Sequence, residues 1–207
     1  MENINNKAYI AGEIVSDFEY SHQTHGENFY LFDVSTVRIS GYADIIPVMI
    51  SERLIDINQS YIGQHISVTG QFRSYNQHEK DRDRLVLSVF AQDYKFIVAD
   101  VVDDSFNQIE LIGYLCKNPS YRKTPLGREI ADMLLAVNRP YNKSDYIPCI
   151  TWGRNARFVS GIAIGSKVKV SGRIQSREYH KKISEEEVET RTAYEVSISK
   201  VEVLDEE

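Results

Sequence analysis

The sequence repeats itself once, and this internal duplication limits the fold more than any other feature of the chain. When residues 6–53 are shifted by 101 positions, no gap is needed, and the identical pairs are Asn6 and Asn107, Gly12 and Gly113, Tyr20 and Tyr121, Gly26 and Gly127, Arg38 and Arg139, Asp44 and Asp145, Ile46 and Ile147, Pro47 and Pro148, and Arg53 and Arg154. A shift of 102 then aligns Ile62, Gly63, Val68, Gly70 and Ser74 with Ile164, Gly165, Val170, Gly172 and Ser176. Because most shared residues are glycines, a proline and apolar residues, they indicate one backbone plan used twice, and function is expected where the copies differ.

The duplication predicts two domains, residues 1–105 and 106–207. Each is long enough to close a small core without a disulfide or a metal. Hydrophobic residues make up 42% of the chain, and no apolar run approaches the roughly 20 residues needed to cross a bilayer. The N-terminus lacks an export signal, and two cysteines suggest no disulfide framework, so we expect a cytoplasmic protein.

Charge is distributed unevenly between the copies. Residues 1–105 hold 8 Lys and Arg against 16 Asp and Glu, whereas residues 106–207 hold 16 against 14. Within residues 117–182 there are 14 basic and 4 acidic side chains. This surplus favours an anion-binding face in the second copy, and scattered surface charge is the alternative.

Short β-type stretches recur at matching places in both copies, and long helical periodicity is missing. In the first copy we predict strands near Lys7–Val15, Asn28–Val37, Asp44–Ser51, His65–Ser74 and Arg84–Phe96, with a short helix near Glu52–Gln59. In the second copy we predict strands near Gln108–Cys116, Arg128–Asn138, Asp145–Trp152, Lys167–Arg177 and Thr192–Leu204, with a short helix near Arg154–Ser160. Five strands with one helix after the third is the order of an OB-fold, so we predict an all-β chain of two tandem OB-fold barrels; a pair of β-sandwiches is the alternative.

Glycines and prolines inside the predicted strands support curved barrels. A strand glycine weakens pairing unless the chain bends sharply or another backbone passes close, and we assign this role to Gly12, Gly70, Gly113 and Gly172. We place Gly26 and Gly127 in turns. Pro47 and Pro148 lack a donor, which predicts an edge position or a bulge.

Two acidic segments interrupt the pattern. Residues Ala99–Ser105 are predicted to be a short connector between the copies. Residues Ile183–Thr190, with the sequence ISEEEVET, are predicted to form a solvated hairpin tip because their like charges resist packing.

The second copy closely resembles the bacterial and phage single-stranded DNA-binding protein family. The segments that carry the resemblance occur in family order and spacing, and they are NPSYRKTPLG, AVNRPY, DYIPCITWGRNA and GRIQSREY, within Asn107–Leu204. In the first copy the resemblance is fainter. It implies sequence-independent binding of single-stranded DNA in replication, recombination or repair, with bases stacked on aromatic side chains along a basic groove.

Motif by motif, the resemblance places the stacking residues at Tyr141, Tyr146, Trp152 and Tyr179. The neighbouring cations that we expect to contact phosphates are Arg122, Lys123, Arg128, Arg139, Lys143, Arg154, Arg173 and Arg177. The physics agrees with this assignment, because an aromatic face accepts any base and cations neutralise the backbone without reading sequence.

The first copy departs from the pattern at the same four places, with Ser40, Ile45, Ser51 and Gln77. Tyr42 and Tyr75 stand nearby, but the acidic charge of this copy opposes a polyanion at long range. We therefore expect the second domain to supply most of the affinity, and the first to supply scaffold, oligomer contacts or a protein-partner surface.

The resemblance also bears on partners. Family members with two barrels per chain can reach four as dimers, so it implies a homodimer. Many bacterial members recruit replication and repair proteins through an acidic tail that ends in an aromatic residue, and the sequence VEVLDEE does not match such a tail. A role for replication or recombination proteins as partners stays open.

Other functions are less well supported. The sequence lacks the common nucleophile, zinc-protease, phosphate-loop and C-x-x-C motifs, so we predict neither an enzyme nor a cofactor. His22 and His25 lie in a polar loop without cysteines, which disfavours a metal. Cys149 and His180 could be proposed as a nucleophile pair, but Cys149 lies in an apolar strand, where a cysteine usually behaves as a small core residue. A protein-interaction module and an RNA-binding protein are the alternatives.

Overall fold

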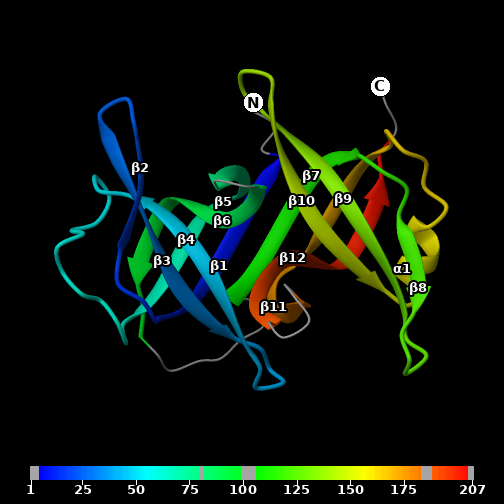
Figure 1. Cartoon of the computed structure of the whole chain (residues 1–207), viewed down its shortest axis with the longest axis horizontal. Helices are drawn as coiled ribbons and strands as arrows, with labels where there is room; N and C mark the ends of the chain where they lie inside the picture. Colours follow the sequence, from blue (N-terminus) through cyan, green and yellow to red (C-terminus); the bar gives the residue numbers. More distant parts are fainter. Residues whose placement is uncertain (1–4, 80–81, 99–105, 183–187, 205–207) are drawn as a thin grey trace.

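The computed structural model describes residues 5–79, 82–98, 106–182 and 188–204, which form almost entirely β-structure (Figure 1). The first barrel consists of β1 (Asn6–Ile14), β2 (Glu19–Thr24), β3 (Glu27–Val37), β4 (Ala43–Ser51), β5 (His65–Glu79) and β6 (Arg82–Phe96). The second barrel consists of β7 (Asn107–Leu115), β8 (Ser120–Lys123), β9 (Glu129–Arg139), β10 (Lys143–Trp152), α1 (Arg154–Val159), β11 (Lys167–Lys182) and β12 (Val188–Val203).

The strand order shows that the two barrels are related by an approximate two-fold axis. In the described part of the chain the strands form one sheet in the order β2-β3-β4-β6-β5-β1-β7-β11-β12-β10-β9-β8, which has equivalent strands at equal distances from its centre. At the centre β1 pairs antiparallel with β7, from Asn6 opposite Leu111 to Ile10 opposite Asn107. Figure 1 shows β1 and β7 side by side between the two barrels.

Each barrel closes as an OB-fold does. In the first barrel β1 pairs with both β3 and β5, and a short parallel pairing of β4 with β6 completes the barrel. In the second barrel β7 pairs with β9 and β11, and β10 pairs in parallel with β12. The predicted all-β, tandem OB-fold class is confirmed, and each of the ten expected strands is present. The structure adds β2 and β8, which the sequence did not indicate.

The helix predicted near Glu52–Gln59 is wrong, because this segment folds into turns. The N–H of Leu54 donates to the carbonyl of Ser51 at 3.0 Å. The carboxylate of Asp56 accepts the N–H of Asn58 at 3.1 Å. Short polar side chains that bind nearby backbone amides compete with helix formation. The aligned segment of the second copy has the better helix former Ala156 and forms α1 as predicted.

The strand glycines lie where another backbone passes close, as expected. A Cβ atom built on Gly12 would lie 2.0 Å from the carbonyl oxygen of Ser35, and one on Gly113 would lie 2.6 Å from that of Ala136. Gly70 and Gly172 sit at register shifts of β5 and β11, where their Cβ atoms would meet backbone oxygens in the same way. These contacts allow the strong curvature of small barrels.

The remaining turn and strand predictions have mixed outcomes. Gly26 and Gly127 adopt φ angles of 77° and 76° in turns, as expected. Pro47 and Pro148 lie in regular register with β3 and β9 and just before the short parallel pairings, so each has a strand neighbour on one side only. The connector Ala99–Ser105 lies outside the described residues, as does most of the insertion Ile183–Thr190.

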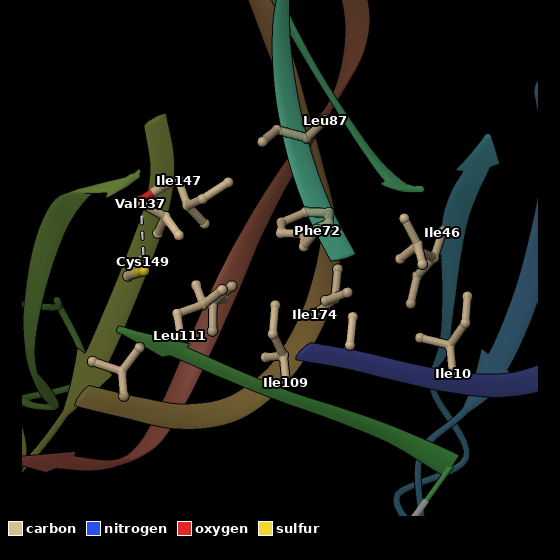
Figure 2. Packing of buried hydrophobic residues seen from close by; sticks show 14 of the residues in the cluster. Ile10, Ile46, Phe72, Leu87, Ile109, Leu111, Val137, Ile147, Cys149 and Ile174 are labelled. Carbon is tan, nitrogen blue, oxygen red and sulfur yellow. Dashed lines mark hydrogen bonds between the residues drawn. The ribbon is translucent and has the colours of Figure 1, made fainter. Parts of the chain in front are cut away.

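Apolar side chains from both barrels form one cluster of buried residues (Figure 2). Phe72 and Ile46 belong to the first barrel, Leu111 and Ile147 to the second, and all four are completely buried. Figure 2 shows buried side chains from both halves of the chain within the same core. The barrels are therefore joined by packing as well as by the β1–β7 pairing.

Two long hairpins cross between the barrels. The part of the β5–β6 hairpin beyond Ser74 forms the first arm (described residues 74–79 and 82–87), and the part of the β11–β12 hairpin beyond Ser176 forms the second arm (described residues 176–182 and 188–194). The first arm contacts β10 of the second barrel, and the second arm contacts β4 of the first barrel. A hairpin from each barrel thus packs against the other barrel.

Candidate nucleic-acid interface

The outer face of β10 carries two of the predicted stacking residues. Side chains alternate along this strand, so Asp145, Ile147 and Cys149 are buried while Tyr146 and Trp152 point outward. Tyr146 is 48% exposed and Trp152 is 40% exposed. Their positions lie six residues apart, which corresponds to about 20 Å along a strand. Several nucleotides of a single strand can lie across this distance.

Tyr141 occupies the tip of the β9–β10 hairpin. Its φ angle is 64°, in the left-handed region that aromatic residues rarely adopt, and its side chain is 95% exposed. Such a backbone conformation costs roughly 1–3 kcal/mol. The corresponding turn of the first barrel contains Gly41, with a φ angle of 81°, and so avoids that cost. An exposed ring held in a strained turn supports a functional role for Tyr141.

Cationic side chains surround the Trp152 end of β10. Arg122 on β8 and Trp152 on β10 both stand opposite Ile130 of β9, so the three residues lie abreast on one face. Arg122 forms an ion pair with Asp132 at 3.0 Å. Lys123, Arg128 and Arg154 are exposed and form no ion pair with another described residue. These cations are available to a polyanion.

A second group of charges lies at the hairpin end of β10. Lys143 is exposed and stands opposite Arg139. The Nε atom of Arg139 lies 3.3 Å from Oδ2 of Asp145, but neither atom makes a hydrogen bond. The first-barrel equivalent is tighter, because Arg38 donates two hydrogen bonds of 2.6 Å to Asp44. Arg139 is therefore held less completely by its carboxylate than Arg38 is.

The Asp145 carboxyl is deeply buried beside arginines from both barrels. Burial raises its pKa, while the N–H of Ser74, Arg139 and Arg73 act in the opposite direction. Burial also lowers the pKa of the Arg73 guanidinium, and the charge of Arg139 adds to that effect. The two arginines thus place concentrated positive charge between the barrels.

Tyr179 lies on a different element from the other three predicted stacking residues, on β11 rather than on the β9–β10 hairpin. It stands on the second arm, beyond the point where Ser176 contacts the first barrel, and is 37% exposed. It lines a groove of about 1160 Å³ that also reaches Arg139 and Pro148. Because Pro148 shares the outer face of β10 with Tyr146 and Trp152, this groove is continuous with the β10 face.

The opposite wall of the groove comes from the first barrel. Arg73 lies over the ring of Phe90, with its guanidinium carbon 3.9 Å from the ring centre. Tyr20 lines the same groove and is 60% exposed. Asp33 and Glu19 make this wall partly acidic, and burial followed by the Glu19 charge raises the pKa of Asp33.

This first-barrel wall could be predicted from the sequence only in part. Tyr75, an aromatic near the substituted family positions, lines the groove, whereas Phe90 and Tyr20 lie elsewhere in the repeat and were not expected there. They line the same groove as Tyr179 because the second arm crosses to the first barrel, and no local sequence pattern indicates that crossing.

Two predicted phosphate contacts are placed less favourably. Arg173 is half-buried in β11. Arg177 is exposed on the second arm, with its Nε atom 3.7 Å from Glu195. They do not extend the cation groups at the two ends of β10.

The alternative chemical sites have no support in the geometry. Burial raises the pKa of the Cys149 thiol strongly, so its nucleophilic thiolate is disfavoured. His22 stacks on Phe29, with ring centres 5.1 Å apart. Among the described residues there is no group of three or more potential metal ligands and no helix long and apolar enough to cross a membrane.

The fold and this face define a class, a tandem OB-fold protein with aromatic and cationic side chains gathered on the second barrel. Residues 106–204 match the model of the single-strand binding protein family. The chain is 41% identical over 81 residues to single-stranded DNA-binding protein B of Bacillus subtilis, covering 36% of this chain and 72% of that protein. The chain belongs to the single-strand binding protein family.

Other relatives match over a smaller share of their length. Single-stranded DNA-binding protein 3 of Listeria innocua is 39% identical over 80 residues, which cover 35% of this chain and 50% of that protein. The chain spans about half the length of the first curated relatives that it matches. The wild-type single-stranded DNA-binding protein from Thermus aquaticus aligns with a TM-score of 0.77 at 18% identity, over 98% of this chain and 94% of that one. This likeness shows that the fold is shared along the whole chain.

Proposed function

We propose that this protein binds single-stranded DNA without sequence preference and protects it during replication, recombination or repair. The observation that carries the proposal is the outward position of Tyr146 and Trp152 on β10, with an exposed cation at each end of that strand, Lys143 and Arg154. Stacking contributes about 1–3 kcal/mol per base and accepts every base, because each has a π-face. Cations such as Lys143 and Arg154 then neutralise phosphates without reading sequence.

The second barrel, residues 106–207, supplies most of the affinity in this proposal, and Tyr141 serves as an outlying platform. In this proposal the single-stranded DNA runs along the β10 face, passes Pro148 and Arg139, and enters the groove that Tyr179 lines. Residues 1–105 form a scaffold that also lines the far wall of that groove. The acidic charges of this wall make it the weaker part of the path.

The proposed function is tested with fluorescently labelled oligo-dT in an anisotropy titration. We expect binding of the oligo-dT to be much tighter than binding of a duplex of the same length. With about four phosphate contacts, the affinity should fall about 50-fold between about 50 mM and about 200 mM salt. Equal binding of duplex, or no binding, would contradict the proposal. Tighter binding of oligo-rU than of oligo-dT would favour the RNA-binding alternative.

The assembly and partners are proposed more broadly. We propose that the protein is a cytoplasmic homodimer, which brings four barrels together. We also propose that it interacts with replication or recombination proteins on the single-stranded DNA. The approximate two-fold symmetry within one chain supports a symmetric assembly. Light scattering at the mass of a single 23.8 kDa chain would contradict the dimer.

A further inference from the structure

The two arms hold the opposite barrels through a pair of equivalent serines. The N–H of Ser74 donates to Oδ1 of Asp145 at 2.8 Å, and Oγ of Ser74 accepts the N–H of Tyr146 at 2.8 Å. In the mirrored place the N–H of Ser176 donates to Oδ1 of Asp44 at 2.9 Å, and its Oγ accepts the N–H of Ile45 at 3.1 Å. Both serines are buried, so water competes little for these hydrogen bonds.

Ser74 provides a hydrogen-bond partner for the free side of β10, which near its hairpin end pairs with a strand on one side only. Near the hairpin end, β10 pairs with β9 through Tyr146 opposite Ala136. Its pairing with β12 is confined to Cys149 and Ile150. The N–H of Tyr146 points away from β9 and finds its acceptor on the first arm. The first barrel therefore fixes the backbone that carries this aromatic ring.

The two serine contacts have the same chemistry but hold different residues. Ser74 holds Tyr146, a proposed base platform, whereas Ser176 holds Ile45, which has no aromatic face. The Ser74 contact also includes Asp145, beside which Arg139 lies. Ser74 of the first barrel thus contacts two parts of the proposed binding face: its hydroxyl accepts from the backbone of Tyr146, and its N–H donates to the carboxylate beside Arg139.

We propose that Ser74 is a positioning residue for the DNA-binding face, so that the first barrel raises the affinity of the second by holding Tyr146 in place before the strand arrives. This inference rests on the proposed function. A preorganised ring does not have to be ordered during binding, and that saving appears as affinity. Ser176 makes the same contacts with Asp44 and Ile45, neither of which is a proposed platform. It acts on the binding face only through Tyr179, farther along the second arm, and therefore has a smaller effect on affinity.

The test compares Ser74→Ala with Ser176→Ala in the full chain. Each variant removes one hydroxyl acceptor from a buried serine, so we expect similar decreases in melting temperature. Binding of labelled oligo-dT, measured where both variants are fully folded, should weaken about fivefold in Ser74→Ala, the loss expected for one hydrogen bond, and weaken less in Ser176→Ala. Equal effects of the two substitutions on affinity would overturn the inference.

A double-mutant cycle separates positioning from general support. If Ser74 acts through the ring of Tyr146, Ser74→Ala should have no further effect on affinity in a Tyr146→Ala background. Additive losses would overturn the inference. If Tyr146→Ala weakens binding and Ser74→Ala does not, the inference fails while the proposed function stands. If Tyr146→Ala itself leaves affinity unchanged, the inference fails and Tyr146 is not a platform, whereas the proposed function fails only if the unaltered chain does not bind oligo-dT.

Discussion

Replacing both platforms of β10, in the double variant Tyr146→Ala and Trp152→Ala, is expected to weaken oligo-dT binding by about 30- to 10⁴-fold. Each ring contributes about 1–3 kcal/mol through base stacking, and every 1.4 kcal/mol is a factor of ten in affinity. Both side chains point outward from β10, so truncating them removes contact area for bases without opening the core. Anisotropy with labelled oligo-dT measures the change, and circular dichroism verifies that the variant is folded.

The matched control is Tyr42→Ala in the first barrel. The Tyr42 side chain is 51% exposed, and the guanidinium carbon of Arg38 already stacks on its ring, 4.6 Å from the ring centre. It lies in the hairpin that corresponds to that of Tyr141 but does not line the groove. Removing it should change the affinity less than twofold, about the scatter of a surface substitution. A large loss in Tyr42→Ala, with little loss in the β10 double variant, would place the DNA on the first barrel.

The substitution Gly172→Ala is expected to destabilise the fold more than any surface change, by about 3 kcal/mol or more. A Cβ atom at this position would lie 2.1 Å from the carbonyl oxygen of Ser197 and 3.0 Å from the Cα of Ile198. Both are backbone atoms of the paired strand β12, so no side-chain rotation relieves the clash. Thermal unfolding should show a decrease in melting temperature of about 6 °C or more.

Gly161→Ala is the control for this prediction. The nearest atom to its added Cβ would be the carbonyl oxygen of Phe158 at 3.7 Å, which is an ordinary contact. We expect a change within about 0.5 kcal/mol. If Gly172→Ala melted at the same temperature as Gly161→Ala, the close approach of β11 and β12 at this register shift would be wrong.

The fold could be predicted from the sequence because its signals are local and occur twice. Each of Gly12, Gly70, Gly113 and Gly172 marks a crowded strand crossing, and the duplication shows that these are features of the backbone plan. The helix α1 was found from its position after the third expected strand. The same reasoning failed at residues 52–59, because two copies of one plan need not share the side chains that favour a helix. In that segment the Asp56 carboxylate accepts the backbone N–H of Asn58, and turns form in place of the expected helix.

The site was only partly predictable. Tyr146 and Trp152 could be placed on one face because strand alternation is a local rule. Tyr179 could not be placed, because the arm that carries it crosses to the other barrel, and that crossing depends on long-range pairing. The carboxylates of Asp44 and Asp145 stood out in the duplication, yet nothing in the sequence indicated that each receives a serine from the opposite barrel.

The most direct test uses the single tryptophan of the chain, Trp152, as its own reporter. Bases that stack on this ring should quench its emission as oligo-dT is added, with a midpoint equal to the Kd from anisotropy, and added salt should restore the emission as the strand is released. If the Trp152 emission stays constant while anisotropy reports full binding, the oligo-dT lies away from β10. That result would contradict base stacking on this face.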